Sequence, residues 1–429
     1  TVIIPTLDEG TEKYREILKN IIKETARPVD SGAVNQVIIM DGTGTEDHPD
    51  REFDKEVIGW AVEFSKDFKK QLEYLKSSRN ARVMSKRFGF RFRYRIFNQK
   101  HPEYYSKFIE FVGPKVTGFD EIKKDKIQKG KGSVLRLSIP ASEGDVICTI
   151  DSDVKSCKDC YCRGLLMPFF KERDTMVTKA SYIRKNTKGE AGGRIKRLVY
   201  DPWAHAIVKK GRFVGIETLN YGTSGEFAFR RSIGNKIRIP DDFGLETSFN
   251  TQVYHHVHGN LNRVKQVDLG IFEHCSSDIE EDRDTGKDPA MEKMSEEISR
   301  AWTMAALDTG LNFSQDEFYQ IYRVEVGDSI ERTKEMIDKS KIARKEGVKY
   351  SEEQIELDMK RLEKYKPRIK SGINKGIKKY NTNEFGGVFP SWREIKESIG
   401  GKNYSQLKEE FSNITDNYTR ELLDELKLI

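Results

Sequence analysis

The sequence predicts an α/β protein in which a mostly parallel sheet is flanked by helices. Short apolar runs alternate with helical patterns in the first half of the chain. Asp8, Asp41 and Asp151 stand at or just after the ends of such runs. The chain has 429 residues, 10% of them aromatic, which is enough for more than one packed unit. Because ligands bind at the carboxyl ends of parallel strands, these carboxylates are the first indication of function.

The individual elements follow from the spacing of apolar residues. Helical segments repeat apolar residues every three or four positions, whereas buried strands form short continuous runs. The first helix, for example, has Tyr14, Ile17 and Ile21 on one face. The predicted elements are a strand at Val2–Pro5, a helix at Thr11–Glu24, a strand at Val37–Met40, a helix at Ser133–Ile139 and a strand at Asp145–Ile150.

A long excursion interrupts this alternation, because 88 residues separate Asp41 from Gly130. One amphipathic helix is predicted over Lys55–Leu75. In Arg87–Arg95, basic and aromatic residues alternate. This stretch could bind nucleic acid, with Arg on phosphates and rings on bases. We favour a strand with aromatic residues inward and Arg outward, which fits the period of two.

The last third of the sequence is helical. Asp288-Pro289 predicts a helix start, as do the capping patterns that begin at Ser351 and Ser391. We expect Pro367 to end the helix that begins after Ser351. The expected organisation is an α/β domain over residues 1–285, with an insertion at 42–129, and a helical C-terminal region over 286–429. The dense charges between Thr333 and Lys379 fit solvated helix faces or an arm on a partner subunit.

Composition excludes several classes of protein. The net charge of +6 is small for a chain in which 34% of residues are charged, so a nucleic-acid partner is not expected. No apolar run approaches the roughly 20 residues of a membrane helix, so membrane insertion is not expected either. The chain starts on its first predicted strand, without a leader pattern, and we expect a cytoplasmic location.

The cysteines allow two interpretations. The chain has five, an odd number, and three of them form the cluster Cys157-x-x-Cys160-x-Cys162. A zinc site would normally need a second Cys or His pair at suitable spacing, and none follows. We therefore expect reduced thiols without a metal.

Asp151-Ser152-Asp153 is the strongest candidate for metal chemistry. It follows the apolar run Val146–Ile150, so both carboxylates are expected at a strand end. Carboxylate oxygens are hard ligands that suit Mg²⁺ or Mn²⁺, and such an ion can bridge a diphosphate.

Two further segments could complete this site. Gly130-Lys131-Gly132 opens a predicted helix, where glycines permit close approach of a phosphate and Lys131 adds positive charge. An ordinary basic loop is an equally good interpretation. The strand-like run from Val264 ends at Glu273-His274, and His274 would complete a metal site if the run returns beside Asp153.

These residues, in this order, resemble the GT-A nucleotide-sugar glycosyltransferases. Three later stretches resemble the glucosyl-3-phosphoglycerate synthase family in particular: Gly192–Ile195, Ser224–Arg231 and Val267–His274. The resemblance covers residues 1–41 and 130–277. It implies a Rossmann-like GT-A fold for the 1–285 domain, a homodimer, and retaining transfer of glucose from UDP-glucose to 3-phosphoglycerate, a step towards the compatible solute glucosylglycerate.

The resemblance also implies roles for individual residues. Glu226, Lys131 and Asp153 would be catalytic, with Glu226 on the glucose hydroxyls and Lys131 on the donor phosphate. The metal, Mg²⁺ or Mn²⁺, would be held by Asp153, His274 and Asp151. The nucleotide sugar would be bound by Pro5, Thr6, Leu7, Glu9, Asp41, Lys131, Ser152 and Asp151. The small phosphorylated acceptor would meet Gly193, Arg194, Lys196 and Ser276.

Two departures from the family pattern fall on the acceptor side. Lys196 stands where the family has Thr, and Ser276 stands where it has Asn. A phosphorylated acceptor remains compatible with the added positive charge of Lys196. Two alternatives stay open: an inverting GT-A transferase with Asp242 or Glu246 as base, and a non-catalytic polyanion-binding protein on the same fold.

Overall fold

The computed structural model describes residues 1–6, 11–45, 48–77, 91–113, 130–186, 188–273, 286–381 and 390–429. Contacts divide the chain into two compact units, each made from separate stretches of sequence. Unit 1 consists of Thr1–Glu172, Glu226–Asp241 and Pro390–Ile429, and unit 2 consists of Arg173–Gly225 and Asp242–Phe389.

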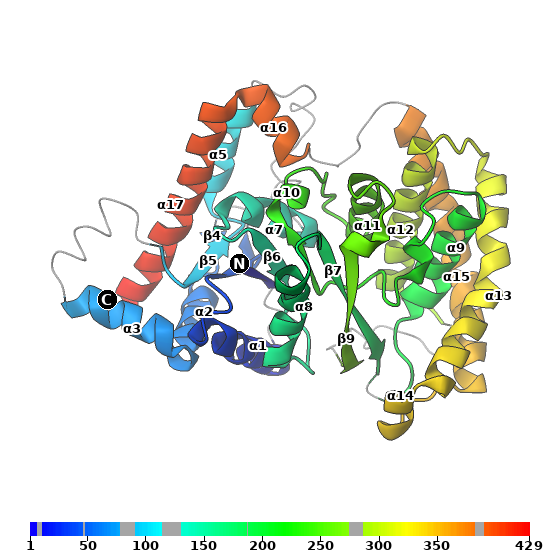
Figure 1. Ribbon diagram of the computed structural model, residues 1–429, viewed down its shortest axis with the longest axis horizontal. Coiled ribbons are helices and arrows are strands. Elements are labelled where there is room, and N and C mark those ends of the chain that lie inside the picture. Colours follow the sequence, from blue (N-terminus) through cyan, green and yellow to red (C-terminus); the bar gives the residue numbers. More distant parts are fainter. Residues whose placement is uncertain are drawn as a thin grey trace. The chain divides into compact units, whose positions relative to one another are not determined.

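Unit 1 has a mostly parallel sheet. Its strands are β1 (Val2–Thr6), β2 (Val37–Asp41), β5 (Tyr94–Asn98), β6 (Val146–Thr149) and β8 (Phe227–Arg230), in the spatial order β5-β2-β1-β6-β8. The pairs β5–β2, β2–β1 and β1–β6 are parallel, and β8 runs antiparallel to β6. A separate short pair joins β3 (Gly44–Thr45) and β4 (His48–Pro49). The predicted α/β class is confirmed, because this largely parallel sheet is flanked by helices (Figure 1).

The helices of unit 1 include those predicted over Thr11–Glu24 and Ser133–Ile139. The helices of this unit are α1 (Glu12–Asp30), α2 (Arg51–Phe64), α3 (Lys66–Ser77), α5 (Pro102–Val112), α7 (Gly130–Ala141), α8 (Asp159–Lys171), α10 (Arg231–Gly234), α16 (Trp392–Ile399) and α17 (Gly401–Glu425). Thr11 caps α1 by accepting a hydrogen bond from the backbone of Tyr14. Helix α7 packs against β1 and β2, and both α2 and α17 pack against β5.

The single helix predicted over Lys55–Leu75 is wrong, because the chain breaks at Ser65 into α2 and α3. Asp30 causes the break from a distant position in the sequence. Its carboxylate accepts hydrogen bonds from the Ser65 hydroxyl and from the backbone of Lys66 and Asp67. The Ser65 hydroxyl also accepts a bond from the Phe68 backbone, as an N-cap residue does.

The strand predicted for the alternating Arg and aromatic residues is confirmed in part. Phe92 and Tyr94 are buried, as the favoured interpretation requires, and β5 begins at Tyr94. Arg95 departs from the expected pattern, since it is fully buried and paired with Asp416 of α17. A guanidinium can be buried here only because this carboxylate and nearby carbonyl groups satisfy it. Residues 87–90 lie outside the described part of the chain.

The C-terminal helices α16 and α17 are part of unit 1. In Figure 1, α17 (red) runs beside α5 (cyan), and the two helices are in contact. The Trp392 indole donates a hydrogen bond to the carbonyl of Arg136 in α7, at 2.8 Å. The predicted capping box at Ser391 is confirmed, with Glu394 as its reciprocal partner.

Unit 2 combines two parallel strands with a helical core. The strands β7 (Val177–Arg184) and β9 (Val264–Phe272) pair with each other, and β9 confirms the strand-like run predicted from Val264. Its α-helices are α9 (Asp201–Lys209), α11 (Leu245–His256), α12 (Pro289–Asp308), α13 (Gln315–Lys339), α14 (Lys341–Lys345) and α15 (Glu352–Asn381). The short helices are η3 (Lys196–Tyr200), η4 (Ile216–Thr218) and η5 (Leu261–Arg263). Trp203, Trp302 and Tyr322 are among the most deeply buried residues of this core.

Two predictions about helix ends in unit 2 need correction. Pro367 does not end a helix, because α15 continues through it to Asn381. Buried residues on both sides of the proline, including Tyr365 and Ile369, hold the helix in the core. Ser351 accepts a bond from the backbone of Gln354, but the Gln354 side chain donates to the carbonyl of Ala191, so this capping box is incomplete.

The start of α12 is as predicted, with Asp288 as N-cap and Pro289 in the first turn. Within the described residues, no helix is long and apolar enough to cross a bilayer.

Candidate active site

The carboxyl ends of β1, β2 and β6 lie at one edge of the unit 1 sheet, because these strands run parallel. Thr6 is paired with Asp41 in the β1–β2 register. Asp151-Ser152-Asp153 follows β6. Since β8 is antiparallel to β6, Glu226, which precedes β8, lies at the same edge. The structure thus brings Thr6, Asp41, Glu226 and the acidic turn 151–153 to one edge of the sheet.

Lys131 is in contact with the acidic turn after β6. Its Nζ lies 2.6 Å from Oδ1 and 2.9 Å from Oδ2 of Asp151. Lys131 also stands in the first turn of α7, where backbone N–H groups and the helix dipole favour an anion. An anionic ligand at this edge would therefore meet both a cationic side chain and a helix N-terminus.

Glu226 is the buried carboxyl group of the site, with 1% of its surface exposed. Burial is the main cause that raises the pKa of Glu226 to about 8. The carboxylates of Asp151 and Asp153 raise this pKa further, whereas Lys131 lowers it. A buried carboxyl group perturbed by such neighbours is typical of functional sites.

The acidic turn suits a hard divalent cation. Asp151 and Asp153 present carboxylate oxygens, the donors that Mg²⁺ and Mn²⁺ prefer. The effect of both carboxylates on Glu226 indicates concentrated negative charge, which a cation would neutralise. Across the described ranges, no group of three or more His, Cys, Asp or Glu side chains is arranged to hold a metal ion. The third predicted ligand, His274, lies outside those ranges.

Sequence reasoning missed Tyr14, which connects two parts of the site. Its hydroxyl lies 2.7 Å from Oγ1 of Thr6 and 2.8 Å from Oγ of Ser152. This one buried side chain of α1 therefore joins the end of β1 to the acidic turn. Its place on the apolar face of a predicted helix gave no sign of this role.

The glycines around Lys131 have a packing role. Gly130 has φ +76°, and a Cβ placed there would lie 2.1 Å from the carbonyl oxygen of Asp241. At Gly132 a Cβ would lie 1.7 Å from the carbonyl oxygen of Pro240. Both glycines are needed because the first turn of α7 lies directly against the backbone of residues 240–241.

Of the predicted acceptor residues, Gly193, Arg194 and Lys196 lie in unit 2, and both cations have carboxylate partners there. Arg194 pairs with Asp288, the N-cap of α12, and Lys196 pairs with Asp201. Gly193 has φ +78°, and a Cβ there would lie 2.8 Å from the Tyr221 hydroxyl. Asp288 was predicted only as a helix cap, and its second role could not be read from the sequence.

Comparisons with known proteins find relatives that share one name. The chain is 28% identical over 198 residues to glucosyl-3-phosphoglycerate synthase of Persephonella marina, covering 44% of this chain and 47% of that protein. It is 25% identical over 163 residues to the synthase of Mycolicibacterium paratuberculosis, covering 36% of this chain and 47% of that protein.

The chain is similar to glucosyl-3-phosphoglycerate synthases. It spans about half the length of the curated relatives that it matches. No family model matches the chain. Among solved structures, it is similar to glucosyl-3-phosphoglycerate synthase from Mycobacterium tuberculosis in complex with Mn²⁺, UDP and glucosyl-3-phosphoglycerate. That likeness has a TM-score of 0.45 and 18% identity over 73% of this chain and 81% of the other.

The remaining predicted site residues are Pro5, Leu7, Glu9 and Ser276. Pro5 lies within β1, next to Thr6. Leu7, Glu9 and Ser276 lie outside the described ranges.

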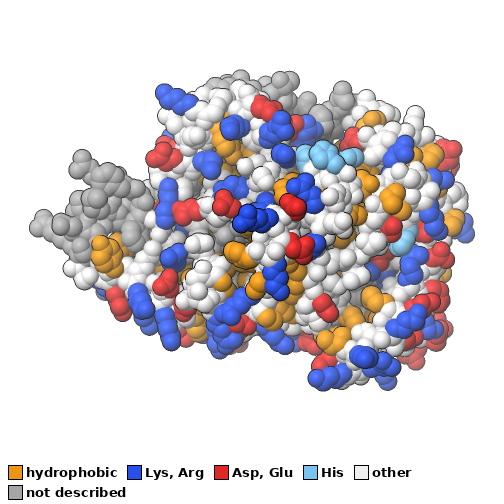
Figure 2. Space-filling view, viewed as in Figure 1, with side chains coloured by type: hydrophobic (Ala, Val, Ile, Leu, Met, Phe, Trp, Pro, Cys, Tyr) orange, Lys and Arg blue, Asp and Glu red, His pale blue; other side chains and the backbone are white. Residues whose placement is uncertain are grey.

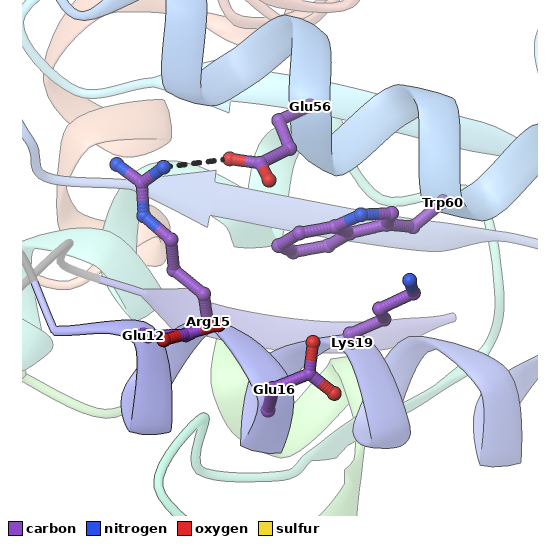
Figure 3. A pocket seen from close by; sticks show the side chains of 6 residues that line it. All are labelled: Glu12, Arg15, Glu16, Lys19, Glu56 and Trp60. Carbon is purple, nitrogen blue, oxygen red and sulfur yellow. Dashed lines mark hydrogen bonds and ion pairs between the residues drawn. The ribbon is translucent and has the colours of Figure 1, made fainter.

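A groove between α1 and α2 is separate from the predicted site residues. Figure 3 shows Glu12, Arg15 and Glu16 on the α1 side, facing Glu56 and Trp60 of α2. The groove has a volume of about 440 Å³, and Arg15 donates a hydrogen bond to Glu56 at 2.9 Å. Its mixed acidic and basic lining indicates no particular ligand.

The cysteines do not form a zinc site within the described residues. Cys148, Cys157 and Cys162 are buried, whereas Cys160 is exposed, and all four are free thiols. Cys275 lies outside the described ranges.

Proposed function

We propose that the chain is a metal-dependent retaining glycosyltransferase that moves glucose from UDP-glucose to a small phosphorylated acceptor, in the first instance 3-phosphoglycerate. The observation that carries this proposal is the contact of Lys131 with Asp151 beside the buried Glu226. A cation, two carboxylates and a buried carboxyl group meet where parallel strands end, which is where α/β proteins bind ligands. Similarity to glucosyl-3-phosphoglycerate synthases supports this assignment.

In this proposal the donor lies along the strand ends of unit 1. Thr6 is held in place by Tyr14, which also fixes Ser152. Lys131 and the α7 N-terminus bind the diphosphate, whose negative charge grows as the bond from sugar to oxygen breaks. The uridine and ribose are bound by Pro5, Thr6, Leu7, Glu9, Asp41, Ser152 and Asp151.

Asp153, Asp151 and His274 would hold the metal. A bound Mg²⁺ or Mn²⁺ neutralises charge on the diphosphate leaving group. Glu226 orients the glucose through its hydroxyl groups. Among the described residues of this site, no carboxylate is evident as a nucleophile, and in this proposal the acceptor attacks from the side that the diphosphate leaves. The bond from the anomeric carbon to the phosphate oxygen breaks, a bond to the acceptor oxygen forms, and the acceptor proton passes to the departing phosphate.

The acceptor is bound through Gly193, Arg194, Lys196 and Ser276. Because Arg194 and Lys196 are paired with Asp288 and Asp201, an anionic acceptor has to compete with these carboxylates. A strongly charged acceptor such as 3-phosphoglycerate competes better than a neutral alcohol does.

A homodimer is proposed from family resemblance alone, and analytical ultracentrifugation tests it.

The alternatives are separated by particular observations. As the base of an inverting enzyme, Asp242 would have to leave its pairing with Arg300 and its hydrogen bond from Gly244. The anomeric configuration of the product, determined by NMR, distinguishes the two reactions. A polyanion-binding protein would need concentrated positive charge, but basic and acidic side chains are interspersed on the face seen in Figure 2.

Asp153→Asn tests the proposed function. We expect it to reduce Mn²⁺-dependent glucosyl transfer from UDP-glucose to 3-phosphoglycerate about 100-fold or more, since it removes a carboxylate at the leaving group. Product formation is measured by mass spectrometry. Asp174→Asn, in the exposed turn before β7, is the matched control and should keep full activity. Wild-type rates in Asp153→Asn would contradict the proposal.

A further inference from the structure

A buried hydrogen-bond network lies directly beneath the end of β2. It joins Asp41 of β2, Asn98 of β5, Asp54 of α2 and Tyr418 of α17. All four side chains are buried, and both aspartates are 0% exposed. The four residues come from four different elements of unit 1, including the insertion and the C-terminal segment that sequence analysis left without a role.

Both polar atoms of the Asn98 side chain form hydrogen bonds. Its Nδ2 donates to Oδ2 of Asp41 at 3.0 Å and to Oδ2 of Asp54 at 3.1 Å. An amide has two such hydrogens, so both are engaged. Its Oδ1 accepts a bond from the backbone of Lys100 at 2.9 Å, which fixes the amide orientation. Asn98 therefore holds the two carboxyl groups at a set separation.

Asp41 connects this hydrogen-bond network to the turn beside the candidate site. Its Oδ1 accepts bonds from the Thr43 backbone at 3.0 Å and from the Thr43 hydroxyl at 2.6 Å, which shapes the turn after β2. The backbone of Gly42 donates to the carbonyl of Thr6 at 2.9 Å. Thr6 in turn contacts Tyr14, which contacts Ser152.

Tyr418 closes the network from the C-terminal helix. Its hydroxyl donates to Oδ2 of Asp54 at 2.5 Å. The next residue, Thr419, accepts a bond from the backbone of Ile96 at 3.0 Å, and Asp416 pairs with Arg95. Helix α17 is thus fixed to β5 independently of Tyr418, so Tyr418 can be changed without releasing the helix.

We propose that Asn98, Asp54 and Tyr418 are positioning residues of the nucleotide site: they hold the Asp41 carboxylate, which orders the Gly42-Thr43 turn beside Thr6. The C-terminal helix is thereby a working part of the site. This inference rests on the proposed function, in which Asp41 and Thr6 bind the uridine part of the donor.

Tyr418→Phe tests the inference, with Thr419→Val as matched control. Both variants remove one buried hydroxyl from α17, and only Tyr418 bonds to the carboxyl pair. We expect Tyr418→Phe to weaken UDP binding in the presence of Mn²⁺ by about three- to tenfold, the net value of one ordinary hydrogen bond. We expect Thr419→Val to bind UDP as the wild type does. Isothermal titration calorimetry gives both affinities.

Kinetics and a rescue variant separate positioning from loss of folding. Tyr418→Phe should raise the KM for the nucleotide sugar and leave kcat unchanged. Adding Asp54→Asn should restore UDP affinity, because a neutral amide no longer needs the tyrosine as a donor while still accepting from Asn98. Circular dichroism checks that each variant is folded.

The outcomes distinguish this inference from the proposed function. If the wild type does not bind UDP, both fail. If the wild type binds and Tyr418→Phe binds equally well, only the positioning role is overturned. Equal losses of affinity in Tyr418→Phe and Thr419→Val overturn it too, because they would reflect general loosening of α17.

Discussion

The places of some side chains near the strand ends could be predicted from the sequence, and the places of others could not. The places of Asp151 and Asp153 after a strand and of Lys131 at a helix start could be predicted, because each stands next to a strong local pattern. Tyr14 and Tyr418 could not, because their partners lie far along the chain. Tyr14 meets Ser152 across 138 positions, and Tyr418 meets Asp54 across 364. Local periodicity places Tyr14 on an apolar helix face, and only the tertiary structure shows where the hydroxyls of both tyrosines lie.

The buried carboxyl group of Asp54 makes the free energy of unfolding depend on pH. Burial raises its pKa to about 6, although hydrogen bonds from Tyr418 and Asn98 act in the opposite direction. Asp50 raises this pKa and Arg51 lowers it. Between about pH 4 and pH 6 the folded chain then holds a proton that the unfolded chain has lost, so stability falls as pH rises.

Asp54→Asn should remove this contribution. Relative to the wild type, the variant should gain roughly 1–3 kcal/mol in the free energy of unfolding between pH 4 and pH 7. Urea unfolding at several pH values measures the difference. Glu63→Gln, on the exposed face of the same helix, should show no such trend. A difference between Asp54→Asn and wild type that stays constant with pH would show that Asp54 ionises normally.

The sequence predicted whether a segment is a helix or a strand better than it predicted where that element begins and ends. The strands at Val2, Val37 and Val146 follow from continuous apolar runs, and the structure confirms them. The break at Ser65 was not visible, because apolar spacing continues across it and its cause, Asp30, lies 35 positions away. Helix α15 passes through Pro367 because the core on both sides outweighs one lost hydrogen bond.

The packing of α7 gives a prediction at the scale of elements. A Cβ at residue 132 would overlap the carbonyl oxygen of Pro240, which backbone geometry holds in place. We expect Gly132→Ala to lower the free energy of unfolding by roughly 2–4 kcal/mol. Gly59→Ala in α2 meets nothing within 4 Å and should raise it by about 0.5–1 kcal/mol. Denaturant unfolding compares the two; equal effects would contradict the close approach.

At the scale of the whole chain, each unit is built from separate stretches of sequence. Unit 1 requires residues 390–429 as well as the first 172 residues. Sequence patterns cannot show this grouping, because the evidence for it is long-range contact such as that between Arg95 and Asp416. The GT-A resemblance covered the site residues but gave no indication of what α17 does.

Removing residues 390–429 should therefore unfold unit 1. The deletion exposes the apolar surface beneath Trp392 and Tyr418 and leaves the buried guanidinium of Arg95 without its carboxylate. We expect an aggregating product that limited proteolysis digests within residues 1–172. Deleting only Lys427–Ile429 is the control and should leave a folded chain. A soluble, protease-resistant unit 1 in the longer deletion would contradict this expectation.

The split composition of unit 1 also sets an order of events during synthesis. As the chain leaves the ribosome, β1, β2 and β5 appear early, yet the helix that covers β5 appears only after all of unit 2 has been made. Until α17 is made, Arg95 lacks the carboxylate of Asp416, and the side of β5 that α17 covers stays exposed. The nascent protein thus carries an unfinished sheet edge while residues 99–400 are made, a state that is prone to aggregation.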